Sequence, residues 1–295
     1  MITFKSREAS GEIINSALHE FTFPAGEKHI KQTEGRPLQP VEIAIFQPTP
    51  DSIHDDLFTL AMWSDYLVAA HPSTKSVLIM PYVPGARADR GIPHGLGIYG
   101  GFINELEIDQ IIIFDPHSQA TPELLKGYEN LTVVYSDELF AMKHMTAVLN
   151  GYHGIIAPDK GAVHRATAVA DLAGLPVYTA TKERDEDTGK LTNFQIEGLD
   201  KNGTYLIVDD ICDGGGTFLG LAAAAGLEFS QLDLFVSHGV FSKEALTNLA
   251  GTFGYVFTTN SYNPTRDLNE SLTYDQFRRF DVIRLLESKI LNYDL

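Results

Sequence analysis

Short apolar runs rich in β-branched residues recur along this chain, and they limit its fold more than any other feature. Seven of them stand out: VEIAIF, SVLIMPY, QIIIFD, LTVVYS, GIIAP, YLIVDD and LDLFVSHGVF. Runs this short and this continuously apolar are typical of strands that are buried on both faces of a parallel sheet. Parallel neighbours need a long crossover connection, so the runs also predict helices between them.

Segments with helical spacing lie where these crossovers are needed. Apolar residues three and four apart predict helices at residues 55–70, 137–150, 163–174 and 218–227. The alternation of strand, turn and helix predicts an α/β protein with two doubly wound parallel-sheet domains.

The domain boundary is expected where the fourth run ends. We expect one domain over residues 1–138 and a second over 139–295, with a long helix from Asp137 leading into the second. The amphipathic segment FDVIRLLESKILN predicts a closing helix at about residues 280–292, packed back on the first domain.

Composition restricts the partners. The 22 Lys and Arg against 39 Asp and Glu give a formal net charge of −17, which opposes binding to a nucleic-acid backbone. A single cysteine, Cys212, excludes an intramolecular disulfide and a thiolate metal cluster, and this fits a reducing compartment. The sequence has neither a signal-like apolar core at its start nor a long apolar run. We therefore expect a soluble cytoplasmic protein without nucleic-acid or membrane partners.

The strongest chemical signal is the stretch YLIVDDICDGGGT at residues 205–217. An apolar strand ends in Asp209 and Asp210, and Asp213 then precedes three glycines and a helix. Backbone N–H groups of such a turn can bind a phosphate at the helix N-terminus. The two strand carboxylates then bind either ribose hydroxyls or a hydrated Mg²⁺. The alternative is a glycine-rich turn with capping aspartates.

This stretch resembles the phosphoribosyl-diphosphate binding motif of type I phosphoribosyltransferases. Further segments resemble one branch of that superfamily, the ribose-phosphate diphosphokinases, in the same order along the chain. They are MPYVPGARADR (80–90), FDPHSQ (114–119), APDKGAVHRA (157–166), TKER (181–184) and SHGVFS (237–242).

The resemblance implies an enzyme that transfers the β,γ-diphosphate of ATP to the C1 hydroxyl of ribose 5-phosphate and releases AMP. It implies Lys182 and Arg184 as catalytic cations, although a solvated charged loop is the other interpretation of that polar stretch. Mg²⁺ is the implied cofactor, with His117 and Asp159 as ligands and Asp115 acting through water. The implied ATP-binding residues are Phe23, Glu27, Arg87, Asp89, Arg90 and His117. The implied ribose-phosphate-binding residues are Asp209, Asp210, Asp213, Gly214, Gly215, Gly216 and Thr217.

The resemblance also implies a homo-oligomer, a dimer or a hexamer, because Phe23 and Glu27 resemble residues that meet adenine across a subunit boundary. Several positions depart from the family pattern. Ala25 and Ala88 replace an expected aspartate and glutamine, which puts adenine recognition in doubt. The small-residue turn of the family's N-terminal segment is absent from MITFKSREASGEII.

The third departure lies in the sugar-phosphate turn, where Gly214 replaces a threonine and opens the space near the 5′-phosphate. We therefore expect an acceptor that is either ribose 5-phosphate or a 5′-substituted ribose such as ADP-ribose. Two other functions stay open: a phosphoribosyltransferase that consumes phosphoribosyl diphosphate, and a non-catalytic regulatory homologue of the synthetase.

Overall fold

The computed structural model describes residues 2–125, 127, 130–184, 191–262 and 276–292, and these form two compact units. Unit 1 runs from the N-terminus to Val134 and also takes in Ser261, Tyr262 and the residues from Ile283 onward. Unit 2 begins at Tyr135, a few residues before the boundary expected from the sequence. Each unit contains a six-stranded sheet with parallel strands, so the α/β class is confirmed.

The sheet of unit 1 is parallel in its centre and antiparallel at one edge. Its order is β2-β1-β5-β6-β7-β8, in which β5 to β8 run parallel, whereas β1 is antiparallel to both β2 and β5. Its strands are β1 (Ile2–Arg7), β2 (Ile13–Asn15), β5 (Val41–Phe46), β6 (Lys75–Met80), β7 (Gln110–Phe114) and β8 (Leu131–Val134). The antiparallel edge was not predicted from the sequence. Its strand ITFKSR has only two apolar residues, Ile2 and Phe4, and is partly exposed.

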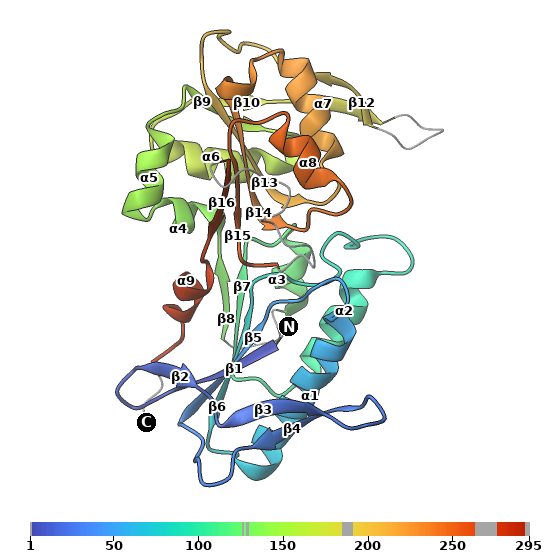
Figure 1. Ribbon diagram of the computed structural model, residues 1–295, viewed down its shortest axis with the longest axis vertical. Coiled ribbons are helices and arrows are strands. Elements are labelled where there is room, and N and C mark those ends of the chain that lie inside the picture. The colour runs from blue at the N-terminus through green and yellow to red at the C-terminus, as the bar shows by residue number, and fades with distance from the viewer. Residues whose placement is uncertain (1, 126, 128–129, 185–190, 263–275, 293–295) are drawn as a thin grey trace. The chain divides into compact units, whose positions relative to one another are not determined.

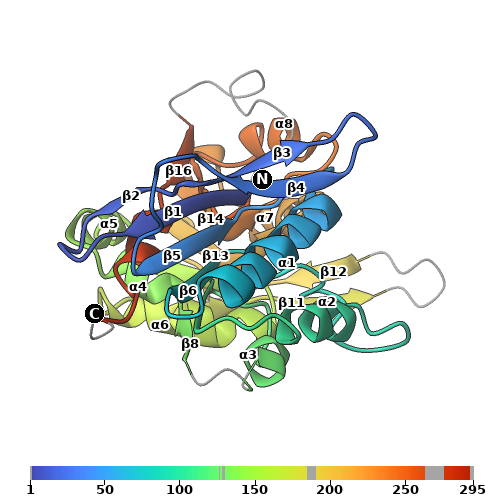
Figure 2. The same ribbon diagram turned by 90° about the horizontal axis from the view of Figure 1, so that it is seen from below.

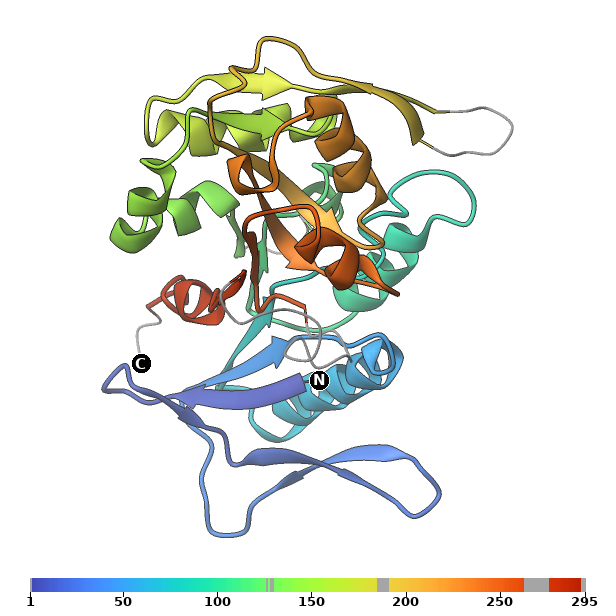
Figure 3. The ribbon, with the colours of Figure 1, turned by 45° about the horizontal axis from the view of Figure 1, so that its top comes forward.

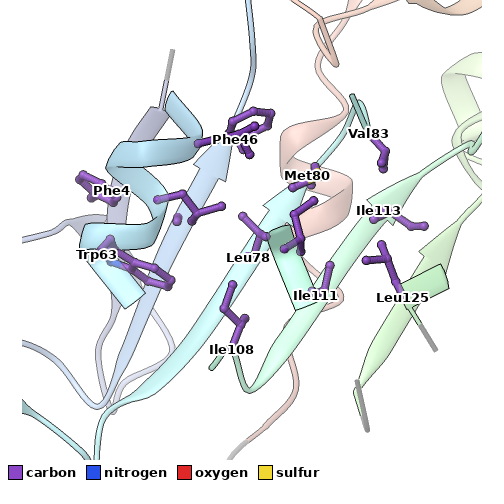
Figure 4. Close-up of a cluster of buried hydrophobic side chains, with 14 of the residues drawn as sticks. Phe4, Phe46, Trp63, Leu78, Met80, Val83, Ile108, Ile111, Ile113 and Leu125 are labelled. Atoms are coloured by element: carbon purple, nitrogen blue, oxygen red, sulfur yellow. The ribbon is translucent and has the colours of Figure 1, made fainter. Parts of the chain in front are cut away.

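Helices cover both faces of this sheet, with α1 (Ile53–Ala70), α2 (Gly95–Asn104) and α3 (Ala120–Leu125) on one side and α9 (Ile283–Glu287) on the other (Figure 1). The core between α1 and the sheet contains Trp63, which is fully buried and stacks on Phe4 at 6.2 Å between ring centroids. Aliphatic side chains of β6 and β7 continue this cluster (Figure 4). Burial of these residues holds unit 1 together.

The C-terminal segment is attached to the same sheet, although α9 is much shorter than the helix expected at 280–292. Lys5 Nζ lies 2.9 Å from Glu287 Oε1. The side chain of Gln110 donates to Lys289 O and accepts from Leu291 N, each at 3.0 Å. The helix starts late because Phe277–Phe280 forms strand β16 and Val282 N donates to the Asn260 side chain.

A separate hairpin of β3 (Leu18–Thr22) and β4 (Lys28–Gln32) belongs to unit 1 and was not predicted from the sequence. Figure 3 shows it as a blue two-stranded element with a turn at its end. Its register places Phe21 opposite His29. The hairpin therefore carries the FPAGE segment at its tip.

The sheet of unit 2 is parallel throughout, in the order β10-β9-β13-β14-β15-β16. Its strands are β9 (Gly154–Ala157), β10 (Val177–Thr179), β13 (Tyr205–Cys212), β14 (Leu232–Gly239), β15 (Val256–Thr259) and β16 (Phe277–Phe280). Helices α4 (Ser136–Phe140), α5 (Lys143–Leu149) and α6 (Val163–Asp171) lie on one side, and α7 (Gly216–Ala225) and α8 (Ala245–Ala250) on the other (Figure 1). The antiparallel pair β11 (Thr181–Arg184) and β12 (Leu191–Gln195) is separate from this sheet (Figure 2).

The prediction of one long helix at residues 137–150 is wrong, because the chain forms the two short helices α4 and α5 there. Met142 between them is extended, with φ −64° and ψ 134°, and this interrupts the helical hydrogen bonding. Within the described ranges, no helix has both the length and the apolar character needed to cross a bilayer.

Candidate functional site

The stretch at residues 205–217 forms the carboxyl end of β13, a short turn and the start of α7. The strand runs past Asp209 and Asp210 to Cys212, because its pairing with β14 continues to Cys212 and Gly239. The two aspartates therefore lie within the strand, not at its end as expected. Only Asp213, Gly214 and Gly215 remain for the turn, and Gly216 and Thr217 belong to the first turn of α7.

The three glycines of the turn have different roles. Gly215 has φ +78° and is the N-cap of α7, a left-handed conformation that favours glycine. Gly214 and Gly216 need no such conformation, and a Cβ at either position would meet no atom within 4 Å. The backbone therefore requires glycine once, and the other two positions leave open space. The ten-residue helix that follows presents its N–H groups and positive dipole end to this space, as an anion site requires.

Asp209 and Asp210 form a close pair of largely buried carboxylates. Their side chains are 17% and 7% exposed, and Asp210 N donates to Asp209 Oδ1 at 2.9 Å. Burial raises the pKa of Asp209 well above its ordinary value, and the neighbouring Asp210 raises it further. Such a pair is suited to hydroxyl donors or to a cation, since either relieves the repulsion between the carboxylates.

Arg165 in α6 is the residue of this site that the sequence did not identify. Its Nη1 lies 3.8 Å from Asp209 Oδ1 and 4.0 Å from Asp210 Oδ1, and it opposes the rise in the pKa of Asp209. The residue stands in the quoted stretch 157–166. The signal that could have identified Arg165 is its position in the first turn of the helix that follows the APDKGA segment.

Asp159, an expected Mg²⁺ ligand, caps the short helix η1 (Lys160–Ala162). Its Oδ1 accepts from Gly161 N at 2.9 Å and from Ala162 N at 3.1 Å. In the described part of the chain, no three His, Cys, Asp or Glu side chains come together as a metal cage. Mg²⁺ commonly uses one or two carboxylates and takes its other ligands from water and substrate phosphates. The donor type of Asp159 and Asp115 fits this ion, and their assignment stays a prediction.

At the carboxyl end of the unit 1 sheet, two of the expected ATP-binding segments meet. Ser118 Oγ, beyond the end of β7, donates to Asp89 Oδ2 at 2.8 Å. This bond, with the neighbouring Arg90 at 3.3 Å, lowers the pKa of Asp89. The loops that follow β6 and β7 are thereby connected, and Ser118 was not singled out from the sequence.

The other expected residues of this region differ in exposure. Asp115 is buried and has φ +40°, an unusual conformation for a residue with a side chain. His117 and Arg87 are exposed.

Phe23 and Glu27 lie at the tip of the β3–β4 hairpin. Phe23 N donates to Glu27 O at 2.8 Å, and Gly26 takes φ +95° between them. The Phe23 ring is 43% exposed and lies 4.9 Å from the Phe21 ring and 5.8 Å from the His29 ring. The hairpin thus presents an aromatic cluster to its surroundings.

Lys182 and Arg184 lie on β11, where Arg184 pairs with Leu191 of β12. The structure therefore has a hairpin strand where a charged loop was expected. The side chains of these two cations, together with residues 185–190, lie outside the described residues.

No family model matches the chain. It is 30% identical over 257 residues to the ribose-phosphate pyrophosphokinase of Pyrococcus abyssi, covering 85% of each chain. It is 29% identical over 241 residues to the protein of that name from Maricaulis maris, covering 78% of this chain and 74% of the relative. Among solved structures, phosphoribosylpyrophosphate synthetase from Mycobacterium smegmatis has the same fold, with a TM-score of 0.75, 21% identity, and coverage of 93% and 89%.

Proposed function

This chain belongs to the ribose-phosphate pyrophosphokinase family of transferases, and on that basis we propose that it transfers the β,γ-diphosphate of ATP to the C1 hydroxyl of ribose 5-phosphate. The observation that carries the proposal is the end of β13, where Asp209 and Asp210 precede a left-handed glycine and the N-terminus of α7. The carboxylates of Asp209 and Asp210 suit hydroxyl groups, and the N-terminus of α7 suits a phosphate. A ribose phosphate carries both kinds of group.

In the proposed reaction, the C1 hydroxyl oxygen attacks the β-phosphorus of ATP. The bond from that phosphorus to the oxygen bridging the α-phosphate breaks, AMP leaves with this oxygen, and the hydroxyl proton is lost. Phosphoryl transfer of this kind depends mainly on positioning and charge neutralisation. Asp209 and Asp210 orient the ribose by accepting from its hydroxyls. Gly214–Gly216, Asp213 and Thr217 surround the 5′-phosphate.

The nucleotide end of the proposal draws on residues of unit 1. Arg87, Asp89, Arg90 and His117 bind the ATP phosphates and sugar. His117 and Asp159, with Asp115 through water, would hold Mg²⁺, and the ion would supply charge neutralisation at the phosphates. Lys182 and Arg184 supply cations to the transferred diphosphate. Phe23 and Glu27 receive adenine from a neighbouring subunit, which makes the active form a homo-oligomer, either a dimer or a hexamer.

The test is a reaction of the purified full chain with ATP, Mg²⁺ and ribose 5-phosphate, analysed for nucleotides by chromatography and for the sugar product by mass spectrometry. The proposal predicts equal amounts of AMP and phosphoribosyl diphosphate. AMP must depend on the acceptor, so the same mixture without ribose 5-phosphate is the control. Consumption of phosphoribosyl diphosphate with a nucleobase, without AMP release from ATP, would instead identify a phosphoribosyltransferase. Nucleotide binding without turnover would identify a regulatory homologue.

A second acceptor is favoured by the open space at Gly214. We propose that a ribose with a larger 5′-substituent, such as ADP-ribose, also reacts, because no atom lies within 4 Å of a Cβ at this position. Gly214→Thr should lower turnover of ADP-ribose while turnover of ribose 5-phosphate persists, as measured by AMP release. Gly101→Ala, which adds a methyl group into open space in α2 and outside the ribose-phosphate turn, is the matched control. Turnover of ribose 5-phosphate with none of ADP-ribose in the unsubstituted protein would exclude this acceptor.

A further inference from the structure

Arg165 reaches the ribose-phosphate turn because of the way β9 ends. This strand stops at Ala157, and β13 pairs with it only as far as Ile207. Beyond Ile207, β13 continues to Cys212 without further pairing to β9. The chain that leaves β9 passes through η1 into α6, and Arg165 is the third residue of that helix. The arginine therefore lies beside the part of β13 that carries the two aspartates.

The three side chains form one largely buried group. Arg165 is 12% exposed, Asp209 17% and Asp210 7%, so water screens their charges only weakly. Neighbouring carboxylates in such surroundings repel each other, and a nearby guanidinium reduces that repulsion. The guanidinium offsets part of this repulsion and leaves the carboxylate oxygens as acceptors. The group therefore still attracts hydroxyl donors.

The separations also indicate how Arg165 acts. Both contacts, at 3.8 and 4.0 Å from the same Nη1, are longer than the roughly 2.7–3.2 Å of a direct hydrogen bond. The arginine thus does not hold either aspartate in a bidentate pair, which would occupy the carboxylate oxygens. Its Nη1 lies near Oδ1 of two consecutive residues of the strand, so one positive charge acts on both carboxylates and restrains them together.

We infer that Arg165 is a positioning residue, whose guanidinium holds the carboxylates of Asp209 and Asp210 in the orientation in which they receive the ribose hydroxyls. The inference rests on the function proposed above and adds a residue to the ribose end of that site. The proposed role of Arg165 requires a positive charge beside Asp209 and Asp210. Lysine keeps the charge but lacks the planar guanidinium, whereas glutamine lacks the charge.

The experiment compares Arg165→Gln, Arg165→Lys and the control His164→Gln, all in the full chain with ATP and Mg²⁺. His164 is the exposed neighbour of Arg165 on the same helix. Arg165→Gln should raise the KM for ribose 5-phosphate by about tenfold or more, the loss expected for a charge-assisted contact, with the KM for ATP changed by less than about twofold. Arg165→Lys should recover part of the loss, and His164→Gln should behave as the unsubstituted protein. Calorimetric titration with ribose 5-phosphate alone gives the same comparison without turnover.

An unchanged KM for ribose 5-phosphate in Arg165→Gln overturns the inference and leaves the proposed function intact. Equal rises in the KM values of both substrates also overturn it, because a disturbance that extends beyond the ribose end has that effect. If the unsubstituted protein neither binds nor converts any ribose phosphate, the proposed function fails, and the inference fails with it.

Discussion

Gly215 carries the backbone geometry of the phosphate turn, and its two glycine neighbours do not. Its φ of +78° lies in the left-handed region, where a side chain costs about 1–2 kcal/mol. Gly216 is helical and has open space around a Cβ. The same substitution should therefore have opposite effects at adjacent positions.

We predict that Gly215→Ala lowers the free energy of unfolding by about 1–2 kcal/mol, from left-handed strain. Gly216→Ala should raise it by up to about 1 kcal/mol, because alanine is the better helix former. Urea unfolding followed by circular dichroism measures both. A loss of stability of the same size in the two variants would contradict the geometry described for this turn.

Glu42 is a buried carboxylate that joins the edge strands of unit 1. Its oxygens accept from Ser6 Oγ at 2.7 Å, Ser16 Oγ at 2.5 Å and Gln39 N at 3.0 Å. Burial raises the pKa of Glu42 in spite of these bonds, which act in the opposite direction. Because the folded protein then binds the proton more tightly than the unfolded chain does, this group favours folding more at low pH.

We predict that unfolding experiments from pH 4 upward show this linkage as a difference between the natural chain and Glu42→Gln. The contribution of Glu42 is fully present below its ordinary pKa of 4.5 and is lost as pH rises through the raised folded value. The natural chain should therefore lose stability relative to Glu42→Gln over that interval. A difference that stays constant with pH would show that the pKa is not raised.

At the scale of elements, the loops that follow β6 and β7 are held together by the bond between Ser118 and Asp89. Both loops belong to the nucleotide end of the proposed site. Strands β6 and β7 determine where these loops begin, but they do not determine the path of either loop. The side-chain bond therefore contributes to the geometry of the two loops.

Ser118→Ala should weaken ATP binding by about 1 kcal/mol, roughly fivefold in KM, through loss of this charge-assisted bond. Ser73→Ala is the control, because Ser73 is exposed in the turn before β6. Steady-state kinetics with varied ATP at saturating ribose 5-phosphate measures both variants. Equal KM values for ATP in the two variants would contradict a role for the bond.

Elements buried on both faces were predictable from the sequence, and those that depend on partners far along the chain were not. The run QIIIF is apolar at the four positions after Gln110, and β7 occupies it fully. In contrast, β16 (FRRF) carries two arginines and exists because it pairs with β15 at the sheet edge. For the site, the glycine turn was visible as a local motif. Arg165 and Ser118 were not, because their roles arise from contacts between segments.

At the scale of the whole molecule, the chain returns to unit 1 after completing unit 2. Ile283, Leu286 and Ile290 are buried there, and Gln110 holds the backbone of the same segment. The C-terminal segment thus packs against the sheet of unit 1, on the face opposite α1. The stability of unit 1 therefore depends on residues that follow unit 2.

We predict that Leu286→Ala lowers the stability of unit 1 by about 2–4 kcal/mol, the usual cost of emptying a buried leucine site. Leu291→Ala should have little effect, since Leu291 is 40% exposed. Fluorescence of Trp63, the single tryptophan and fully buried in unit 1, reports the transition. Equal stability of the two variants would argue against the C-terminal segment as a stabilising part of unit 1.

In the proposed reaction, a ribose phosphate held at the β13–α7 turn receives a diphosphate from ATP. The most direct measurement uses ATP labelled at the β-phosphorus, with Mg²⁺ and ribose 5-phosphate, and follows the label. We predict that the label leaves the nucleotide and appears in the diphosphate on C1, with unlabelled AMP as the other product, and that replacing both Asp209 and Asp210 by asparagine abolishes the transfer. Retention of the label in ADP or ATP would contradict the account.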